Sequence, residues 1–151
     1  MKVKREVRTI EKAVMVYTAE DGKEFFSERE CREYENQTLL APKIAAAEKL
    51  RIEELNGVIP LVDYEAVAEY STYSWYEVKN EEEYEVLDDA YGGDVCVPKN
   101  YPEIICMEST GGEAYMGDSY CYMLSEIRET TEKFWEKMGY EVMLTKKAEE
   151  Q

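Results

Sequence analysis

The sequence contains no histidine. Histidine is the side chain whose ordinary pKa lies nearest neutrality, so its absence excludes the Ser-His and Cys-His couples on which many hydrolases depend. General acid or base chemistry would have to come from carboxylates, lysine or tyrosine. The four cysteines form no Cys-x-x-Cys pair, and without histidine a mixed zinc site has no second ligand type. We therefore expect no catalytic residues of these classes, no metal and no cofactor.

Long apolar runs are also missing. No stretch approaches the roughly 18 apolar residues of a membrane span, and the basic start MKVKREVRTIEKAV lacks the continuous apolar segment of a signal peptide. These absences predict a cytoplasmic protein without a membrane partner. Because thiols stay reduced in that compartment, we expect free cysteines that lie mostly in the core: Cys31, Cys96, Cys106 and Cys121.

Positive charge is scarce. The chain has 34 acidic residues against 18 lysines and arginines, which gives a formal net charge of −16. A protein of this charge repels phosphate backbones and attracts basic surfaces, so direct binding to nucleic acid is not expected. A basic partner, such as a nucleic-acid-binding protein, fits better. The alternative is that the acidity only keeps the surface well solvated.

The length and the apolar content suit one domain. A chain of 151 residues with 44% hydrophobic residues is predicted to fold as a single domain over 1–151, with a frayed tail from about residue 146. Near the start, VRTIEKAVMVYTAEDGKEFF predicts a long strand and a short return strand. The Asp21-Gly22 step between them favours a tight hairpin turn.

Two helical segments are predicted next. Ser27 and Glu30 have the spacing of a capping box, which opens a helix that Pro42 is expected to interrupt near Leu40. A second helix is predicted over APKIAAAEKLRIEELNG, closed by Gly57. A kinked helix and a helical hairpin both fit this pattern.

The second half alternates strands and helices. The segment from Tyr70 to Asn80 has the two-residue period of a strand, and Asn80 then caps a helix that stops at Gly92-Gly93. YPEIICMES and SYCYMLS predict an antiparallel strand pair. Ser125 is expected to cap a last helix, and residues 140–144 to form an edge strand. The order predicts an α+β fold, a mostly antiparallel sheet with helices packed on one face.

Three segments resemble small uncharacterised proteins of bacteriophages and mobile elements in Gram-positive bacteria. They are YTAEDGKEFFSERECREYE, WYEVKNEEEYEVL and SYCYMLSEIRETTEKFWEKMGYE, which together touch most of the chain. The resemblance implies a phage-encoded accessory role in the host cytoplasm, with inhibitors of host defence as one class. It implies no catalytic motif.

The densest group of acids is the candidate partner-binding site. Carboxylates along a helix can imitate a row of phosphates and so enter a basic cleft. The first candidate group contains Glu81, Glu82, Glu83, Glu85, Asp88, Asp89 and Asp94, and the second contains Glu20, Asp21, Glu24, Glu28 and Glu30.

Aromatic residues are abundant, with 13 tyrosines in the chain. Tyrosine is frequent at interfaces, so Tyr73 and Trp75 are added to the partner-binding group, and a homodimer is a further possibility. Phe134 and Trp135 fall at the helical spacing of the last predicted helix, and we expect them to be core residues.

Two alternatives stay open. The loops AYGGDV and STGGEAYMGD match no P-loop and are expected to be plain turns, but Gly111 and Gly112 with Arg128 would line a pocket for a small nucleotide if their elements converged. A carboxylate-based enzyme is the third class, and it needs acids that converge from separate elements. The favoured interpretation is a non-enzymatic acidic protein, encoded by a phage, that inhibits a basic host protein such as a defence nuclease.

Overall fold

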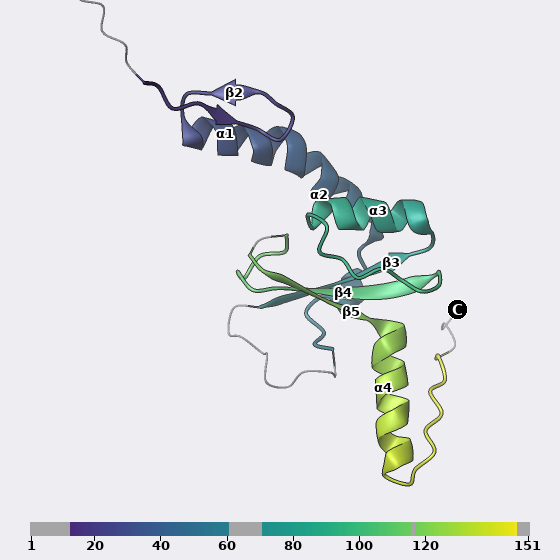
Figure 1. The fold of residues 1–151 in the computed structure, drawn as a ribbon. Helices are drawn as coiled ribbons and strands as arrows, with labels where there is room; N and C mark the ends of the chain where they lie inside the picture. Colours follow the sequence, from purple (N-terminus) through teal and green to yellow (C-terminus); the bar gives the residue numbers. More distant parts are fainter. Residues whose placement is uncertain (1–12, 61–70, 116, 148–151) are drawn as a thin grey trace, which may run out of the picture. The chain divides into compact units, whose positions relative to one another are not determined.

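The computed structural model describes residues 13–60, 71–115 and 117–147. The chain divides into two compact units, Met1–Ala41 and Pro42–Gln151, and each is described by itself. Figure 1 shows the elements of both. The prediction of one domain over the whole chain stays a prediction.

The N-terminal unit begins with a hairpin. Strand β1 (Tyr17–Thr18) pairs antiparallel with β2 (Glu24–Phe25), and Gly22 takes a positive φ of 88° in the turn between them. The predicted hairpin is therefore confirmed, although the paired strands are only two residues long. Helix α1 (Glu28–Tyr34) follows, and Ser27 Oγ accepts the Glu30 N–H at 3.5 Å as its N-cap.

Helical structure continues from α1 without the predicted interruption at Pro42. A π-helical segment, η1 (Glu35–Leu40), leads into α2 (Ala41–Ala47) and then into a 3₁₀ turn, η2 (Glu48–Leu50). A π turn spans one residue more than an α turn, and proline has no N–H that needs an acceptor in the turn that follows. The expected break was wrong because the wider turn accommodates the ring.

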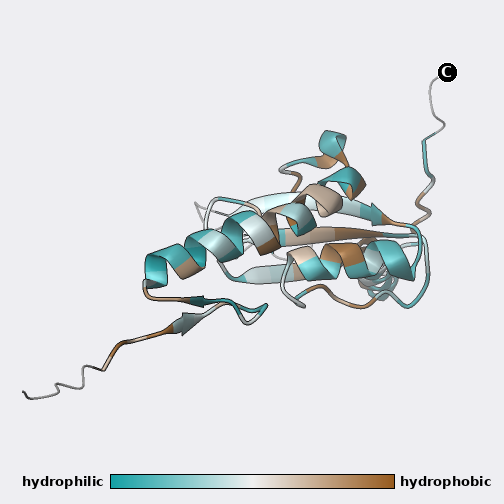
Figure 2. Cartoon of the chain, turned by 90° about the horizontal axis from the view of Figure 1, so that it is seen from above, coloured by the Kyte–Doolittle hydropathy of each residue, from teal (hydrophilic) through white to brown (hydrophobic). Residues whose placement is uncertain are grey.

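The C-terminal unit is built on a three-stranded antiparallel sheet in the order β3-β4-β5. Its strands are β3 (Thr72–Val78), β4 (Glu103–Ser109) and β5 (Ser119–Met123). All three predicted strands of this region are confirmed, with Cys106 of β4 opposite Trp75 on one side and Tyr122 on the other. Figure 2 shows the central strand as the most hydrophobic of the three.

Both faces of this sheet are covered. On one face Tyr76 and Ile105 pack with Leu87 of helix α3 (Glu81–Ala90). On the other face Trp75 packs with Ile127 of helix α4 (Leu124–Lys137). The α+β class and the antiparallel pairing are as predicted. The helices are shared between the two faces, because alternate residues of β3 and β4 are apolar on both.

The free edge of β3 is partly covered by the segment that follows η2. The N–H of Ile52 donates to the carbonyl of Trp75 at 2.8 Å, and that of Gly57 donates to Tyr73 at 2.9 Å. This segment contains one 3₁₀ turn, η3 (Glu53–Leu55), and was predicted to be helical as far as Gly57. That prediction was wrong because strand-edge carbonyls, which local sequence does not reveal, take these N–H groups.

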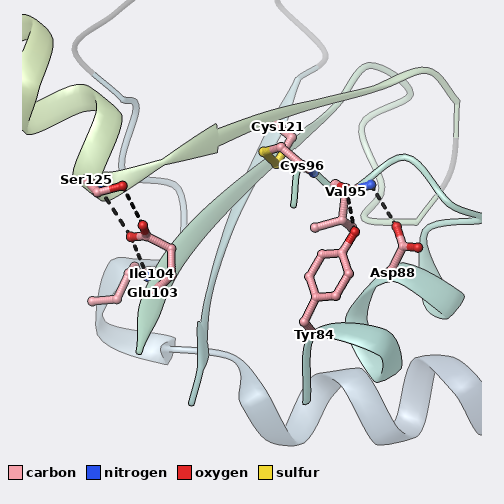
Figure 3. The surroundings of a disulfide bond; sticks show 8 residues. All are labelled: Tyr84, Asp88, Val95, Cys96, Glu103, Ile104, Cys121 and Ser125. Carbon is pink, nitrogen blue, oxygen red and sulfur yellow. Dashed lines mark hydrogen bonds between the residues drawn. A yellow bond between two sulfur atoms is a disulfide. The ribbon is translucent and has the colours of Figure 1, made fainter. Parts of the chain in front are cut away.

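Helix α4 is capped from a neighbouring strand. Its N-cap residue is Met123, which offers no side-chain acceptor. Glu103 of β4 instead accepts the Ser125 N–H at 3.3 Å and the Ser125 hydroxyl, as Figure 3 shows. The predicted capping role of Ser125 was wrong: a carboxylate from another element satisfies the first turn.

The end of α4 also differs from the expectation. Gly139, with a positive φ of 86°, ends the helix, and residues 140–147 have no regular structure, so the predicted edge strand is absent. Phe134 and Trp135 are 55% and 41% exposed, so their expected place in the core was wrong. Only the first turns of α4 reach the sheet within the part of the chain that the structure describes.

Cys96 and Cys121 form a disulfide that ties the loop after α3 to β5 (Figure 3). The expectation of four free thiols was therefore wrong for this pair, whose members are 25 residues apart and meet only through the fold. Cys31 and Cys106 are free and buried as expected, and burial raises the pKa of the Cys106 thiol to about 12. Among the described residues, no helix combines the length and apolarity needed to cross a bilayer.

Replacing the disulfide should lower the stability measurably. Closing a loop of 25 residues removes chain entropy from the unfolded state, so C96S/C121S should lose about 3 kcal/mol of unfolding free energy. Urea denaturation followed by circular dichroism measures the loss. Dithiothreitol should lower the stability of the original chain and leave the double variant unchanged; equal stability of the oxidised chain and the variant would contradict the expectation.

Candidate acidic interaction surface

The start of α3 is fixed by two side-chain bonds that resemble a capping box. Asn80 Oδ1 accepts the Glu83 N–H at 2.9 Å, and Glu83 Oε2 accepts the Lys79 N–H at 2.7 Å. Asn80 thus satisfies a free donor of the first turn, and Glu83 bonds the N–H of the residue before the N-cap. The carboxylate of Glu83 therefore has a structural role, and it is only partly exposed.

The inner face of α3 and the loop after it are also fixed. Leu87 and Ala90 are buried, and Tyr84 Oη donates to the carbonyl of Val95 at 3.0 Å. The N–H of Val95 donates to Asp88 Oδ1 at 3.0 Å, which Figure 3 shows beside the disulfide. Asp88 is thus a second predicted site residue whose carboxylate holds the fold together.

The other acids of α3 point into solvent and form what we call the acidic row. Its members are exposed: Glu81, Glu82, Glu85 and Asp89. Residues three and four apart lie on the same helical face, with about 5–6 Å between neighbours. That spacing is close to that of successive phosphates in a nucleic-acid strand, about 7 Å or less.

The acidic row has no cationic partner among the described residues. Seven ion pairs join other acids, such as Glu28 with Arg32 and Glu132 with Arg128, but none involves a member of the row or the exposed Asp94 that follows α3. Like charges along one face repel one another. The C-terminal unit therefore carries a concentrated, uncompensated negative charge on a rigid helix.

The second predicted acidic group, in the N-terminal unit, is partly compensated. Asp21 accepts the Tyr34 hydroxyl at 2.8 Å and the Lys23 N–H at 3.1 Å, and these bonds lower the pKa of its carboxyl. Glu28 pairs with Arg32 at 2.7 Å. Glu20, Glu24 and Glu30 of this unit are also exposed, and none of them forms an ion pair with a described residue.

Tyr73 and Trp75 do not belong to the acidic surface. They are 6% and 5% exposed and lie on the sheet face opposite to α3, in the cluster that contains Ile127. Trp75 Nε1 donates to the carbonyl of Val58 at 2.7 Å. Side chains alternate between the two faces of β3, so the sequence alone left open which face Tyr73 and Trp75 occupy. In the structure they lie on the face that α4 covers.

A buried carboxylate that sequence reasoning missed lies beneath this second face. Glu108 of β4 is 2% exposed and accepts three hydroxyls, from Ser71 at 2.9 Å, Tyr73 at 3.2 Å and Tyr122 at 3.0 Å. A buried carboxylate is costly unless it is fully hydrogen-bonded, and these donors come from the two strands that flank β4, Ser71 and Tyr73 from the start of β3 and Tyr122 from β5. The sequence offered one signal of this buried carboxylate: an acidic residue within a predicted strand that is mostly apolar.

A chain of tyrosine hydroxyls runs through the first face. Tyr76 donates to Tyr115 at 2.8 Å, and Tyr115 donates to Glu48 Oε1 at 2.9 Å. Since the single proton of Tyr76 points to Tyr115, the bond of 3.0 Å between Tyr91 and Tyr76 has Tyr91 as its donor. Burial raises the pKa of all three phenols. Tyr115 has a positive φ of 64°, and these bonds hold it there.

The predicted nucleotide pocket is not formed by the residues expected for it. Gly111 and Gly112 lie in the β4–β5 connection, whereas Arg128 is on α4 and pairs with Glu132 at 2.9 Å. A cleft of about 620 Å³ does lie beside the connection, and it takes its cation from Arg51. Its polar lining includes Asn56, Ser71, Thr72 and Glu113.

The described residues contain no group of three or more acidic or cysteine side chains placed to hold a metal ion. Comparison of the chain with family models, with curated proteins and with solved structures gives no match. The candidate surface therefore rests on its own geometry and charge.

Removing the buried carboxylate should destabilise the fold strongly. Glu108→Ala leaves three hydroxyls without their acceptor and opens a void, so we expect a loss of roughly 2–4 kcal/mol of unfolding free energy. Tyr73→Phe removes one donor and should cost about 1 kcal/mol. Urea denaturation compares the two, and equal losses would contradict the assigned role of Glu108.

The tyrosine chain predicts alkaline instability. Because folding raises the pKa of Tyr76, Tyr91 and Tyr115 above the ordinary value of about 10, their contribution is fully present below pH 10 and is lost as the pH rises beyond it. Absorbance at 295 nm should show phenols that ionise only together with the loss of circular dichroism. Ionisation of all tyrosines in the folded state would contradict this.

Proposed function

We propose that the protein is a non-enzymatic binding protein that docks its acidic row against a basic surface of a partner protein. The observation that carries this proposal is the set of four exposed carboxylates on one face of α3, none of which forms an ion pair with a described residue. The helix that presents them is held by its cap and by Leu87, not by the acids of the row. A partner can therefore use their charge without disturbing the fold.

The chemistry favours a partner that itself binds nucleic acid. A chain of net charge −16 repels phosphate, whereas a nucleic-acid-binding protein offers a basic groove spaced for phosphates. The acidic row has a comparable spacing and would occupy such a groove by mimicry. The resemblance to phage and mobile-element proteins supports an inhibitor of a host defence nuclease, acting in the host cytoplasm.

The disulfide has to be reconciled with a location in the host cytoplasm. Reducing systems of a cytoplasm would keep Cys96 and Cys121 as thiols. The hydrogen bonds at the start of α3 do not involve either cysteine, although both cysteines pack against the core cluster that contains Leu87. Binding through the acidic row is therefore expected in both redox forms.

The cleft beside Arg51 favours a second candidate, a protein that sequesters a small nucleotide. Its volume of about 620 Å³ lies within the usual range of ligand pockets, about 300–1,000 Å³. The guanidinium already bonds Glu48 at 3.1 Å and Asn56 at 2.6 Å, so hydroxyl and amide groups would supply most contacts. A rise in melting temperature with a nucleotide, lost in Thr72→Val, supports this candidate.

A pull-down from host lysate tests the first proposal. Recovery of a basic, nucleic-acid-binding protein that elutes with salt supports it, because exposed charges are screened beyond about 8 Å at physiological ionic strength. Mass spectrometry identifies the protein, and nucleotide analysis detects any bound ligand. Recovery of a nucleotide without any protein would contradict the proposal that the acidic row docks on a basic partner protein.

Neutralising the acidic row should weaken binding to that partner. E82Q/E85Q/D89N removes three exposed charges and should slow association about 10-fold or more at low salt. The matched control E20Q/E24Q/E30Q removes three exposed charges from the N-terminal unit and should change association much less. Surface plasmon resonance measures both rates; an equal effect would show that net charge alone drives binding.

A further inference from the structure

Helix α4 carries an apolar seam that the described chain leaves mostly open. The residues of this seam recur at intervals of three and four: Leu124, Ile127, Thr131, Phe134 and Met138. Such spacing is that of the a and d positions of a two-helix seam. Ile127 is buried on the sheet, whereas Leu124, Phe134 and Met138 are 40%, 55% and 59% exposed.

Most of the seam lies beyond the part of α4 that contacts the sheet. Figure 1 shows α4 leaving the sheet after its first turns. Ile127 is the one residue of its 14 that the described chain buries. Helices of this length are marginal in water and owe their stability to packing of an apolar face. Covering Phe134 and Met138 would therefore stabilise α4 directly.

The charges beside the seam indicate which molecule covers it. The flanking e and g positions hold Arg128, Thr130, Trp135 and Lys137, with no carboxylate among them. The four acids of α4 fall at the outer positions of the same pattern: Glu126, Glu129, Glu132 and Glu136. In a chain of net charge −16, this flank is a place where a second acidic copy can approach without local repulsion.

An antiparallel arrangement satisfies both the seam and the charge. It places Thr131 against Phe134 of the partner copy, and Arg128 beside the partner copy's Trp135, where a guanidinium and an indole attract each other. The sheet and the acidic row lie at the N-terminal end of α4, so antiparallel helices separate the two acidic bodies. The helix is about 21 Å long, well beyond the screening length of about 8 Å.

We propose that the protein forms a two-fold dimer in which α4 packs antiparallel on α4 of a second copy. Two identical patches then meet in a closed, self-complementary contact. Trp135 makes edge-to-face contacts with Phe134 at 5.3 Å and with Tyr140 at 5.7 Å, and the stated register brings Phe134 and Trp135 of each copy close to the two-fold axis. The dimer is independent of the acidic row and leaves it exposed on each copy.

Sedimentation of the full chain over a concentration series tests the dimer. The original chain should sediment as a dimer, and F134E/M138E should raise the dissociation constant about 100-fold or more, because two buried apolar contacts are lost. Lys133→Glu changes the net charge of the chain by the same −2, on the outer face of α4, and should stay dimeric. A monomer at every concentration, or a dimer that survives F134E/M138E, would overturn the proposal.

The orientation has its own test. Thr130 and Lys137 both occupy g positions, which face each other only in an antiparallel pair. An equal mixture of Thr130→Cys and Lys137→Cys chains should form the mixed disulfide under mild oxidation, while the buried Cys31 and Cys106 stay protected. Crosslinking confined to identical chains would overturn the antiparallel arrangement.

Discussion

The larger sheet depends on one constraint: β4 is buried on both faces and hydrogen-bonded on both edges. A carboxylate buried on such a strand must be hydrogen-bonded, because an unsatisfied buried charge is costly. Glu103 meets this requirement by capping α4, and Glu108 by accepting three hydroxyls. These two acids therefore tie other elements to the central strand: Glu103 holds the start of α4, and Glu108 holds Ser71, Tyr73 and Tyr122.

The need to hydrogen-bond buried carboxylates also divides the acids of this chain into structural ones and exposed ones. The carboxylates that support the fold are engaged with N–H and O–H donors, as Glu83, Asp88 and Glu108 are. The acidic row contributes nothing comparable, and its mutual repulsion is tolerated because Leu87 anchors α3 in the core. Structural and exposed acids thus alternate along one short helix, and the exposed ones are available for a partner.

Local signals predicted elements of both units. The two-residue period of β3, the cap at Asn80 and the turn at Asp21-Gly22 each depend on neighbours in sequence, and each is present in the structure. Predictions failed where a distant group intervened. Segment 51–57 follows the edge of β3 rather than a helical pattern, and the π turn removes the expected break at Pro42. The pairing of Cys96 with Cys121 likewise requires two elements to meet.

The sequence by itself determined the charge, the lack of histidine chemistry, the α+β class and the position of most strands, because composition and periodicity are local properties. Only the tertiary structure decided which acids are exposed, which are structural, and that Tyr73 and Trp75 belong to the core. It also decided that Phe134 and Trp135 stay exposed. The physical reason is that the exposure of a side chain depends on which element covers it, and periodicity identifies a face without identifying its cover.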